Sequence, residues 1–88
     1  MKQIWKYSIK IGERIIEMPK GAKILCVKEQ FEQICLWVEV YPANKKEKRH
    51  FIVYGTGHII NDTAQIYLGS VKLLGGALIY HIYELIGK

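Results

Sequence analysis

The segment Tyr54-Gly55-Thr56-Gly57-His58 has the most distinctive spacing of chemically capable residues in the chain. Two glycines around a threonine allow positive φ angles and let the backbone come close to another surface. Thr56 adds a hydroxyl and His58 an imidazole beside the backbone amides, and successive N–H groups in such a turn can form a concave nest for an anion. The segment therefore indicates either a phosphate site or a tight turn that packs against a neighbouring strand, and its spacing alone allows both.

Catalytic chemistry has little support in the sequence. An enzyme needs an activated group beside a partner that takes or gives a proton. Cys26 and Cys35 lie in apolar runs and match no CxxC pattern, so we expect buried free thiols. The histidines show neither HxH nor HExxH spacing. We therefore expect no enzyme, no cofactor and no bound metal.

Residues suited to base and phosphate recognition are better represented. Trp5 and Trp37 offer flat rings on which a base could stack, although most of the aromatic residues are expected to fill the core or a subunit interface. Nearby lysines and an arginine could attract phosphate groups. The predicted ligand-binding residues are Gly55, Thr56, Gly57, His58, Lys20, Lys23, Arg49, Trp5 and Trp37.

The length and composition predict a single domain over residues 1–88 that associates with copies of itself. A chain of 88 residues buries a modest core, yet half of its residues are hydrophobic. Most segments carry Ile, Leu, Val or Tyr on both alternating faces. Because a lone small domain cannot hide that much apolar surface, we expect a homo-oligomer.

The basic charge favours phosphate-bearing partners. Thirteen Lys and Arg against eight Asp and Glu give a net charge of +5. Part of the excess lies in Lys45 to Arg49, which follows Pro42 and is expected to form a solvated hairpin tip. No signal-peptide pattern and no apolar run of roughly 18 residues occurs, so we expect a soluble, cytoplasmic protein without membrane contact.

Alternating apolar and polar residues predict an all-β fold. The clearest strand covers residues 34–41, with Ile34, Leu36, Val38 and Val40 on one face. Residues 49–54 are expected to return beside it as the second strand of a long hairpin. Strands recur about every 8 to 12 residues between turn signals. This pattern favours a small antiparallel β-sandwich or partly open barrel, assembled as a homo-oligomer.

The chain resembles a family of short phage and prophage proteins that carry a domain of unassigned function. The resemblance covers almost the whole chain. It rests on a series of segments in a fixed order, which are Ile4-Trp5-Lys6-Tyr7, Met18-Pro19-Lys20-Gly21-Ala22-Lys23-Ile24-Leu25, Leu36-Trp37, Arg49 with Phe51, Tyr54-Gly55-Thr56-Gly57-His58, Tyr67-Leu68-Gly69-Ser70, and Gly76-Ala77-Leu78-Ile79-Tyr80-His81-Ile82-Tyr83-Glu84. Small phage proteins of this kind often look like inhibitors of host defence that sequester a nucleotide messenger.

The resemblance implies a non-catalytic protein that binds and sequesters a cyclic oligonucleotide immune signal. Two alternatives remain open on the residues alone. The first is a protein-binding inhibitor or assembly module that acts through an exposed sheet face or strand edge. The second is a small nucleic-acid-binding protein that uses Lys45 to Arg49 and nearby aromatic residues.

Overall fold

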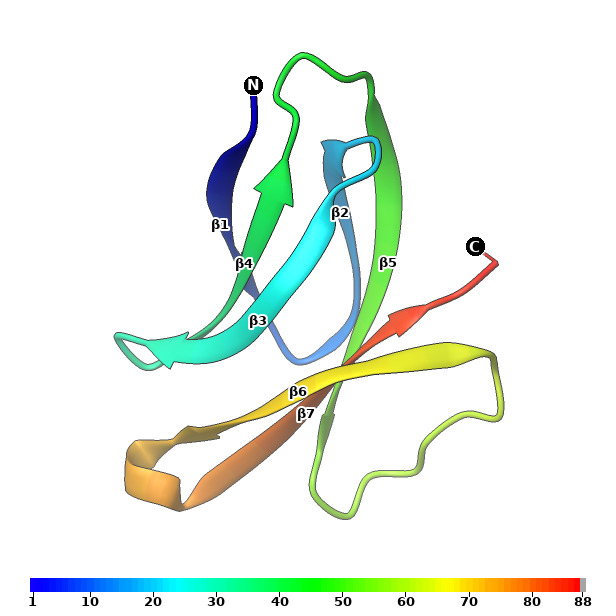
Figure 1. The fold of residues 1–88 in the computed structure, drawn as a ribbon. Helices are drawn as coiled ribbons and strands as arrows, with labels where there is room; N and C mark the ends of the chain where they lie inside the picture. The colour runs from blue at the N-terminus through cyan, green and yellow to red at the C-terminus, as the bar shows by residue number, and fades with distance from the viewer. Residues whose placement is uncertain (88) are drawn as a thin grey trace.

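The computed structural model describes residues 1–87 and consists of β-strands joined by short connections (Figure 1). One 3₁₀ turn, η1 (Leu74–Gly76), joins the last two strands, and no α-helix occurs in the described part. No helix there is long and apolar enough to cross a membrane. The strands are β1 (Gln3–Ile9), β2 (Gly12–Pro19), β3 (Lys23–Gln30), β4 (Gln33–Val40), β5 (Lys46–Gly55), β6 (Gln65–Leu73) and β7 (Leu78–Leu85).

The strands form two antiparallel sheets, which confirms the all-β prediction. One sheet has three strands in the order β1-β4-β3, and the other has four in the order β2-β5-β7-β6. Figure 1 shows β2 and β5 running roughly along the direction of β1 and β4, whereas β6 and β7 run across that direction, with β6 beside β3. No ladder of hydrogen bonds joins β3 to β6 within residues 1–87, so the barrel is not closed.

The central strand of the smaller sheet follows the predicted alternation. Ile34, Leu36, Val38 and Val40 of β4 are buried and point toward the other sheet. They pack against Phe51, Val53, Val71 and Ile82 of the larger sheet. Burial of these apolar faces against each other is the main stabilising term, because each sheet alone would leave its apolar face in water.

The expected hairpin between residues 34–41 and 49–54 is wrong. β4 pairs with β1 and β3, whereas β5 pairs with β2 and β7 in the other sheet. The connection at residues 41–45 therefore crosses from one layer to the other. Both strands are strongly apolar on their inward faces, so they gain more by facing each other across the core than by lying side by side.

The tight β3–β4 turn was not apparent from its residues. Phe31 and Glu32 both have positive φ angles, of 51° and 62°, in a place where Asn or Gly is usual. The Glu29 carboxylate accepts a hydrogen bond from the Glu32 amide at 2.7 Å. The Glu32 carboxylate in turn accepts one from the Leu74 amide at 3.0 Å, which ties this turn to η1.

The Arg49 side chain forms an ion pair within the larger sheet and a hydrogen bond to the chain just before β3, at the end of the sandwich away from that turn. Arg49 of β5 donates from Nε and Nη2 to the Glu84 carboxylate of β7, at 2.5 and 2.9 Å. Its Nη1 donates to the Ala22 carbonyl, just before β3, at 2.8 Å. The side chains are only 18% and 16% exposed. The hydrogen bonds to Glu84 raise the pKa of Arg49, although partial burial opposes them.

We predict that Arg49→Met destabilises the fold. The change leaves the Glu84 carboxylate and the Ala22 carbonyl without their shared donor, and we expect the free energy of unfolding to fall by about 2 kcal/mol. Urea unfolding followed by circular dichroism measures this loss. The double variant Arg49→Met/Glu84→Leu removes both charges and should recover part of it. Equal stability of the single variant and the wild type would contradict the role of the pair.

Candidate functional site

The Gly-Thr-Gly-His segment forms a tight turn at the end of β5. The His58 amide donates to the Gly55 carbonyl at 3.1 Å, and the Gly55 amide donates to Nδ1 of His58 at 2.9 Å. Gly57 has a φ of 91°, which favours glycine. A Cβ at Gly55 would lie 2.9 Å from Cε1 of His58, so the imidazole packs where only glycine leaves room. Gly57 is thus needed for its positive φ angle, and Gly55 is needed to leave space for the His58 ring.

A chain of hydroxyl and imidazole groups fixes this turn on the outer face of the larger sheet. Thr56 Oγ1 lies 2.9 Å from Nε2 of His81 on β7, and Nδ1 of His81 lies 2.7 Å from Ser70 Oγ on β6. Ser70 Oγ is 2.6 Å from the Tyr67 hydroxyl. Ser70 and His81 are direct partners in the β6–β7 ladder, which explains why their side chains meet.

The hydrogen bonds hold the Thr56 hydroxyl between two partners. Thr56 Oγ1 lies 3.3 Å from the Ile79 carbonyl, to which it can donate, and 2.9 Å from Nε2 of His81. The tautomer of His81 sets the direction of the second bond: with the hydrogen on Nε2 the ring donates to Thr56, and with the hydrogen on Nδ1 it accepts from Thr56. In both tautomers the arrangement orients the Thr56 hydroxyl.

Two donors of the turn remain available to a ligand. The Gly57 amide has no hydrogen-bond partner within residues 1–87, and Gly57 is exposed. His58 is also exposed, and because its Nδ1 accepts from Gly55, its neutral ring carries the hydrogen on Nε2. An N–H pair of this kind suits an anionic or carbonyl oxygen.

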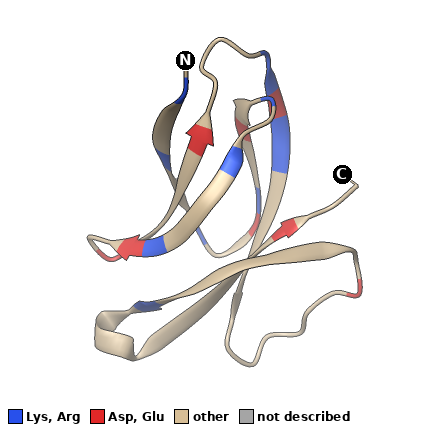
Figure 2. Cartoon of the chain, viewed as in Figure 1, with Lys and Arg blue, Asp and Glu red and all other residues tan. Residues whose placement is uncertain are grey.

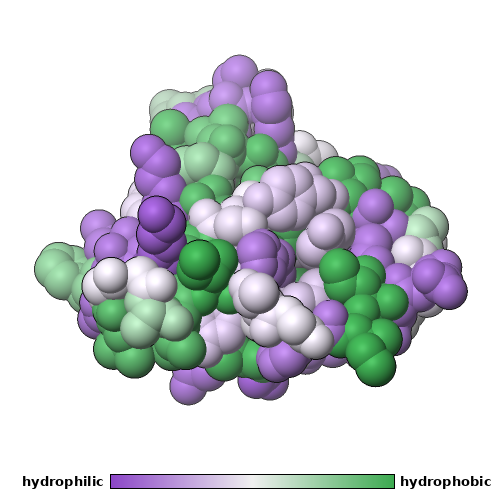
Figure 3. All heavy atoms as spheres, turned by 90° about the horizontal axis from the view of Figure 1, so that it is seen from below, coloured by the Kyte–Doolittle hydropathy of each residue, from purple (hydrophilic) through white to green (hydrophobic). Residues whose placement is uncertain are grey.

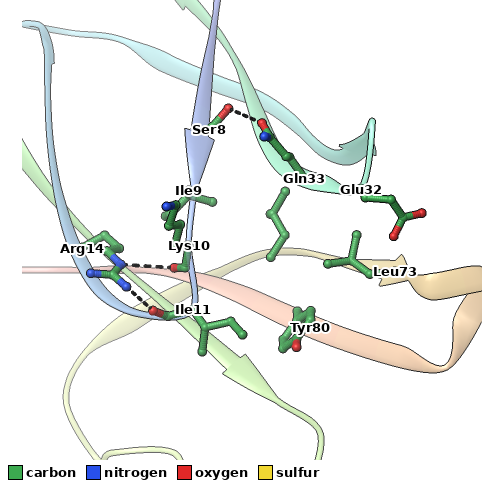
Figure 4. Close-up of a pocket in the computed structure, with 10 residues that line it drawn as sticks. Ser8, Ile9, Lys10, Ile11, Arg14, Glu32, Gln33, Leu73 and Tyr80 are labelled. Carbon is green, nitrogen blue, oxygen red and sulfur yellow. Dashed lines mark hydrogen bonds between the residues drawn. The ribbon is translucent and has the colours of Figure 1, made fainter.

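A cleft of about 460 Å³ opens between the two sheets beside this turn (Figure 4). Ser8 and Gln33 of the smaller sheet line one side, and Leu73 and Tyr80 of the β6–β7 hairpin lie across from them. Lys10 and Arg14 supply positive charge, and Arg14 is held by the Ile11 carbonyl at 2.7 Å. The size lies within the range of small-molecule sites, which is roughly 300 to 1,000 Å³.

A second cleft of about 360 Å³ lies against the turn itself. Gly55, Thr56 and His58 form one wall, and the start of β7 forms the other. Ile11 and Tyr80 line both clefts, so the two hollows adjoin. A ligand that spans them would meet cationic side chains at one end and the turn's donors at the other.

The predicted ligand-binding residues do not converge on one place in the chain. Gly55, Thr56 and His58 line the second cleft, and Gly57 adjoins them. The remaining five residues lie elsewhere. Lys20 and Lys23 flank the β2–β3 turn at the other end of the sandwich, and Arg49 is engaged in its ion pair. Trp5 packs against the core, and Trp37 lies on the outer face of the smaller sheet.

Sequence reasoning missed Lys10, Arg14, Tyr80 and His81 as site residues. His81 is 25 residues from Thr56, and only the pairing of β5 with β7 brings the two together. Lys10 and Arg14 flank the β1–β2 turn at Gly12, and this proximity to a glycine turn was the one signal available. Within residues 1–87, no group of His, Cys, Asp and Glu side chains could hold a metal ion.

Comparison with known proteins places the chain in a family. A family model described as a domain of unknown function, DUF7352, matches residues 1–88. The chain belongs to the DUF7352 family. The match confirms the expected kinship with a family of unassigned function. Searches of curated proteins and of solved structures each returned no match.

We predict that Gly55 and His58 are energetically coupled in this DUF7352 protein. Gly55→Ala places a methyl group against the imidazole, and we expect it to lower the free energy of unfolding by about 1 kcal/mol. In a His58→Ala background the same change should cost less than half as much. Urea unfolding of the four proteins in this double-mutant cycle measures the coupling.

Gly57→Ala is the matched control for this cycle. Gly57→Ala should lower the free energy of unfolding because of the positive φ angle at this position, and by the same amount with or without His58. Equal penalties for Gly55→Ala in both backgrounds would show that the ring does not occupy the space over Gly55.

Proposed function

We propose that the protein binds a cyclic oligonucleotide immune signal and sequesters it without cleaving it. The observation that carries the proposal is the pair of adjoining clefts, with Lys10 and Arg14 at one end and the donors of the Gly-Thr-Gly-His turn at the other. A phage-encoded inhibitor of host defence would act in this way in the host cytoplasm. It would lower the free concentration of the messenger by stoichiometric capture.

The charges along the clefts support an anionic ligand. Lys10 is exposed and lines the first cleft. Glu32 is the one carboxylate among the residues that line the two clefts, and one of its oxygens is engaged by the Leu74 amide. Tyr80 lies between the cationic end and the turn, where its ring can contact a base or ribose.

Binding without cleavage is supported by the His81 tautomer that donates from Nε2 to Thr56 while Thr56 donates to the Ile79 carbonyl. In this tautomer Thr56 lacks the base that phosphodiester attack requires. The hydroxyl is held in place as a contact for ligand oxygens. A protein of this design inhibits in proportion to its concentration, and the ligand is recovered intact.

A symmetric oligomer would enclose such a ligand more fully than a single chain. The part of the chain from residue 56 to residue 87, here called the β6–β7 lobe, has exposed apolar side chains. Ile59 is 89% exposed, Leu74 62% and Ile66 52%. Figure 3 looks at the molecule from below and shows hydrophobic side chains in patches on both sides of a paler strip. Burial of these patches against a second copy would stabilise a dimer beside the clefts.

Electrostatics favour the same lobe as the contact between copies. Residues 50–88 carry Asp62, Lys72, Glu84 and Lys88, whose formal charges cancel, so the whole excess of +5 lies in residues 1–49. Figure 2 shows most of the basic residues on β1, β3, β5 and the turns near them. Two copies that meet through the β6–β7 lobe therefore bring little like charge together.

Native mass spectrometry with a panel of cyclic di- and trinucleotides tests the proposal. We expect a discrete oligomer that gains a fixed number of intact nucleotide masses. Lys10→Gln should weaken the affinity by about tenfold, because it removes one charge-assisted contact. Thr56→Ala/His58→Ala should abolish binding and leave the oligomer intact.

Lys45→Gln is the control for net charge, since Lys45 lies in the exposed loop between β4 and β5 and should leave the affinity unchanged. Full affinity in the Thr56→Ala/His58→Ala variant would reject this site. Cleaved nucleotides would establish an enzyme. An oligomer that gains no nucleotide would favour the alternative of a protein-binding inhibitor, for which the exposed apolar side chains of the β6–β7 lobe are the available surface.

A further inference from the structure

The outer face of the three-stranded sheet has a composition that the proposed ligand site does not explain. Alternate residues of β1 and β4 point away from the core. In β3 the register shifts between Ile24 and Cys26, and the intervening Leu25 is 42% exposed. The side chains on this face are Ile4, Lys6, Ser8, Lys23, Cys26, Lys28, Cys35, Trp37 and Glu39. They form a basic surface around one large aromatic ring.

Trp37 lies at the centre of this face. It is on the middle strand, with Lys6 of β1 directly opposite on one side and Cys26 of β3 on the other. Trp37 is partly exposed and is not among the residues packed against either hydrophobic cluster. A tryptophan on a central strand, outside the core and flanked by a small residue, leaves room for a flat group to stack on it.

The charges around Trp37 are predominantly positive. Lys6, Lys23 and Lys28 are exposed, and they lie on the strands to both sides of the ring. Lys6 Nζ donates to the Gln30 side chain at 2.6 Å, which holds its ammonium group over the sheet. Glu39 is the one carboxylate on this face, and the Lys2 ammonium lies 3.7 Å from it. The face therefore attracts a chain of negative charges.

We propose that this face binds single-stranded nucleic acid. A base stacks on Trp37, and the phosphates that flank it contact Lys6 on one side and Lys23 or Lys28 on the other. Stacking on aromatic rings with lysines along the backbone is the general means by which sheets bind single strands without reading sequence. A duplex keeps its bases paired and stacked, so it could engage the lysines but not the tryptophan.

Ser8 lies at the edge of this face and also lines the first cleft, but the tryptophan and lysines of the face are separate from the clefts. Neither cleft includes Trp37, Lys6, Lys23 or Lys28 among its lining residues. Binding of a single strand here is thus independent of the proposed capture of a cyclic oligonucleotide. It also differs from binding through Lys45 to Arg49, because that segment belongs to the β4–β5 loop and to β5 of the other sheet.

Fluorescence anisotropy with labelled 12-nucleotide oligo-dT and oligo-rU, at several salt concentrations, tests the proposal. Trp37→Leu should weaken binding by about tenfold, because the stacked base loses its ring. Lys6→Gln and Lys28→Gln should each weaken binding and lower the slope of log K against log salt by about 0.7. A 12-base-pair duplex should bind more weakly than the single strands and should be insensitive to Trp37→Leu.

Intrinsic tryptophan fluorescence provides a second readout, which is measured in a variant that keeps Trp37. The chain contains two tryptophans, so Trp5→Phe leaves Trp37 as the sole indole. Oligo-dT should quench the emission of Trp5→Phe as it quenches the wild type, and the quenching should be lost in Trp37→Leu. This result stands even if Trp37→Leu proves less stable, because Trp5→Phe keeps the face intact.

Lys46→Gln is the control for net charge. If it weakens binding and flattens the salt dependence as much as Lys6→Gln does, the charge of the whole protein and not this face attracts the oligonucleotide. The absence of quenching at low salt would also overturn the proposal. Binding of Trp5→Phe to anionic phosphatidylserine vesicles, with no affinity for oligonucleotides, would overturn it in favour of a membrane surface.

Discussion

The Arg49 guanidinium fixes how the two layers of this protein sit on each other. It pairs with Glu84 in its own sheet and donates to the Ala22 carbonyl, which precedes β3 of the other sheet. Apolar burial holds the layers together but is not directional, so it allows sliding and rotation. The two charged hydrogen bonds from Arg49 to Glu84, together with the third to the Ala22 carbonyl, have fixed directions and therefore select one orientation of the layers. The clefts lie at the other end of the sandwich, where the Glu32 carboxylate accepts from the Leu74 amide.

The division of the strands between two sheets separates three surfaces with different chemistry. Because the chain crosses from β4 in one layer to β5 in the other, the basic N-terminal strands face water on both sheets. The β6–β7 lobe is nearly free of charge and exposes apolar side chains. The clefts lie between these regions. A fold of 88 residues therefore has three regions of different charge and polarity, and the sites proposed for an anionic ligand, a second copy and a single strand lie in different ones.

The Gly-Thr-Gly-His turn has a structural role in the same residues for which we propose a binding role. Gly55 leaves room for the imidazole, and Nδ1 of His58 completes the turn by accepting from Gly55. His81 forms a hydrogen bond with Thr56, and Ser70 forms one with His81, so the Thr56 side chain is held in place. A turn that is already ordered costs a ligand little conformational entropy on binding, and this favours rigid capture over induced fit. The same hydrogen bonds leave the Gly57 amide and His58 facing solvent.

The sequence by itself determined the strands, the inward face of β4 and the glycine turn at residues 55–57, because these follow from local alternation and from the φ angles that glycine allows. Only the tertiary structure decided which strands pair, and so it decided the site. The hairpin expected between residues 34–41 and 49–54 does not form, Arg49 is paired and not free, and Trp5 and Trp37 point to opposite sides of one sheet. Thr56 meets His81 through the same long-range pairing. Pairing depends on which faces exclude water together across the whole chain, and no local window of residues contains that information.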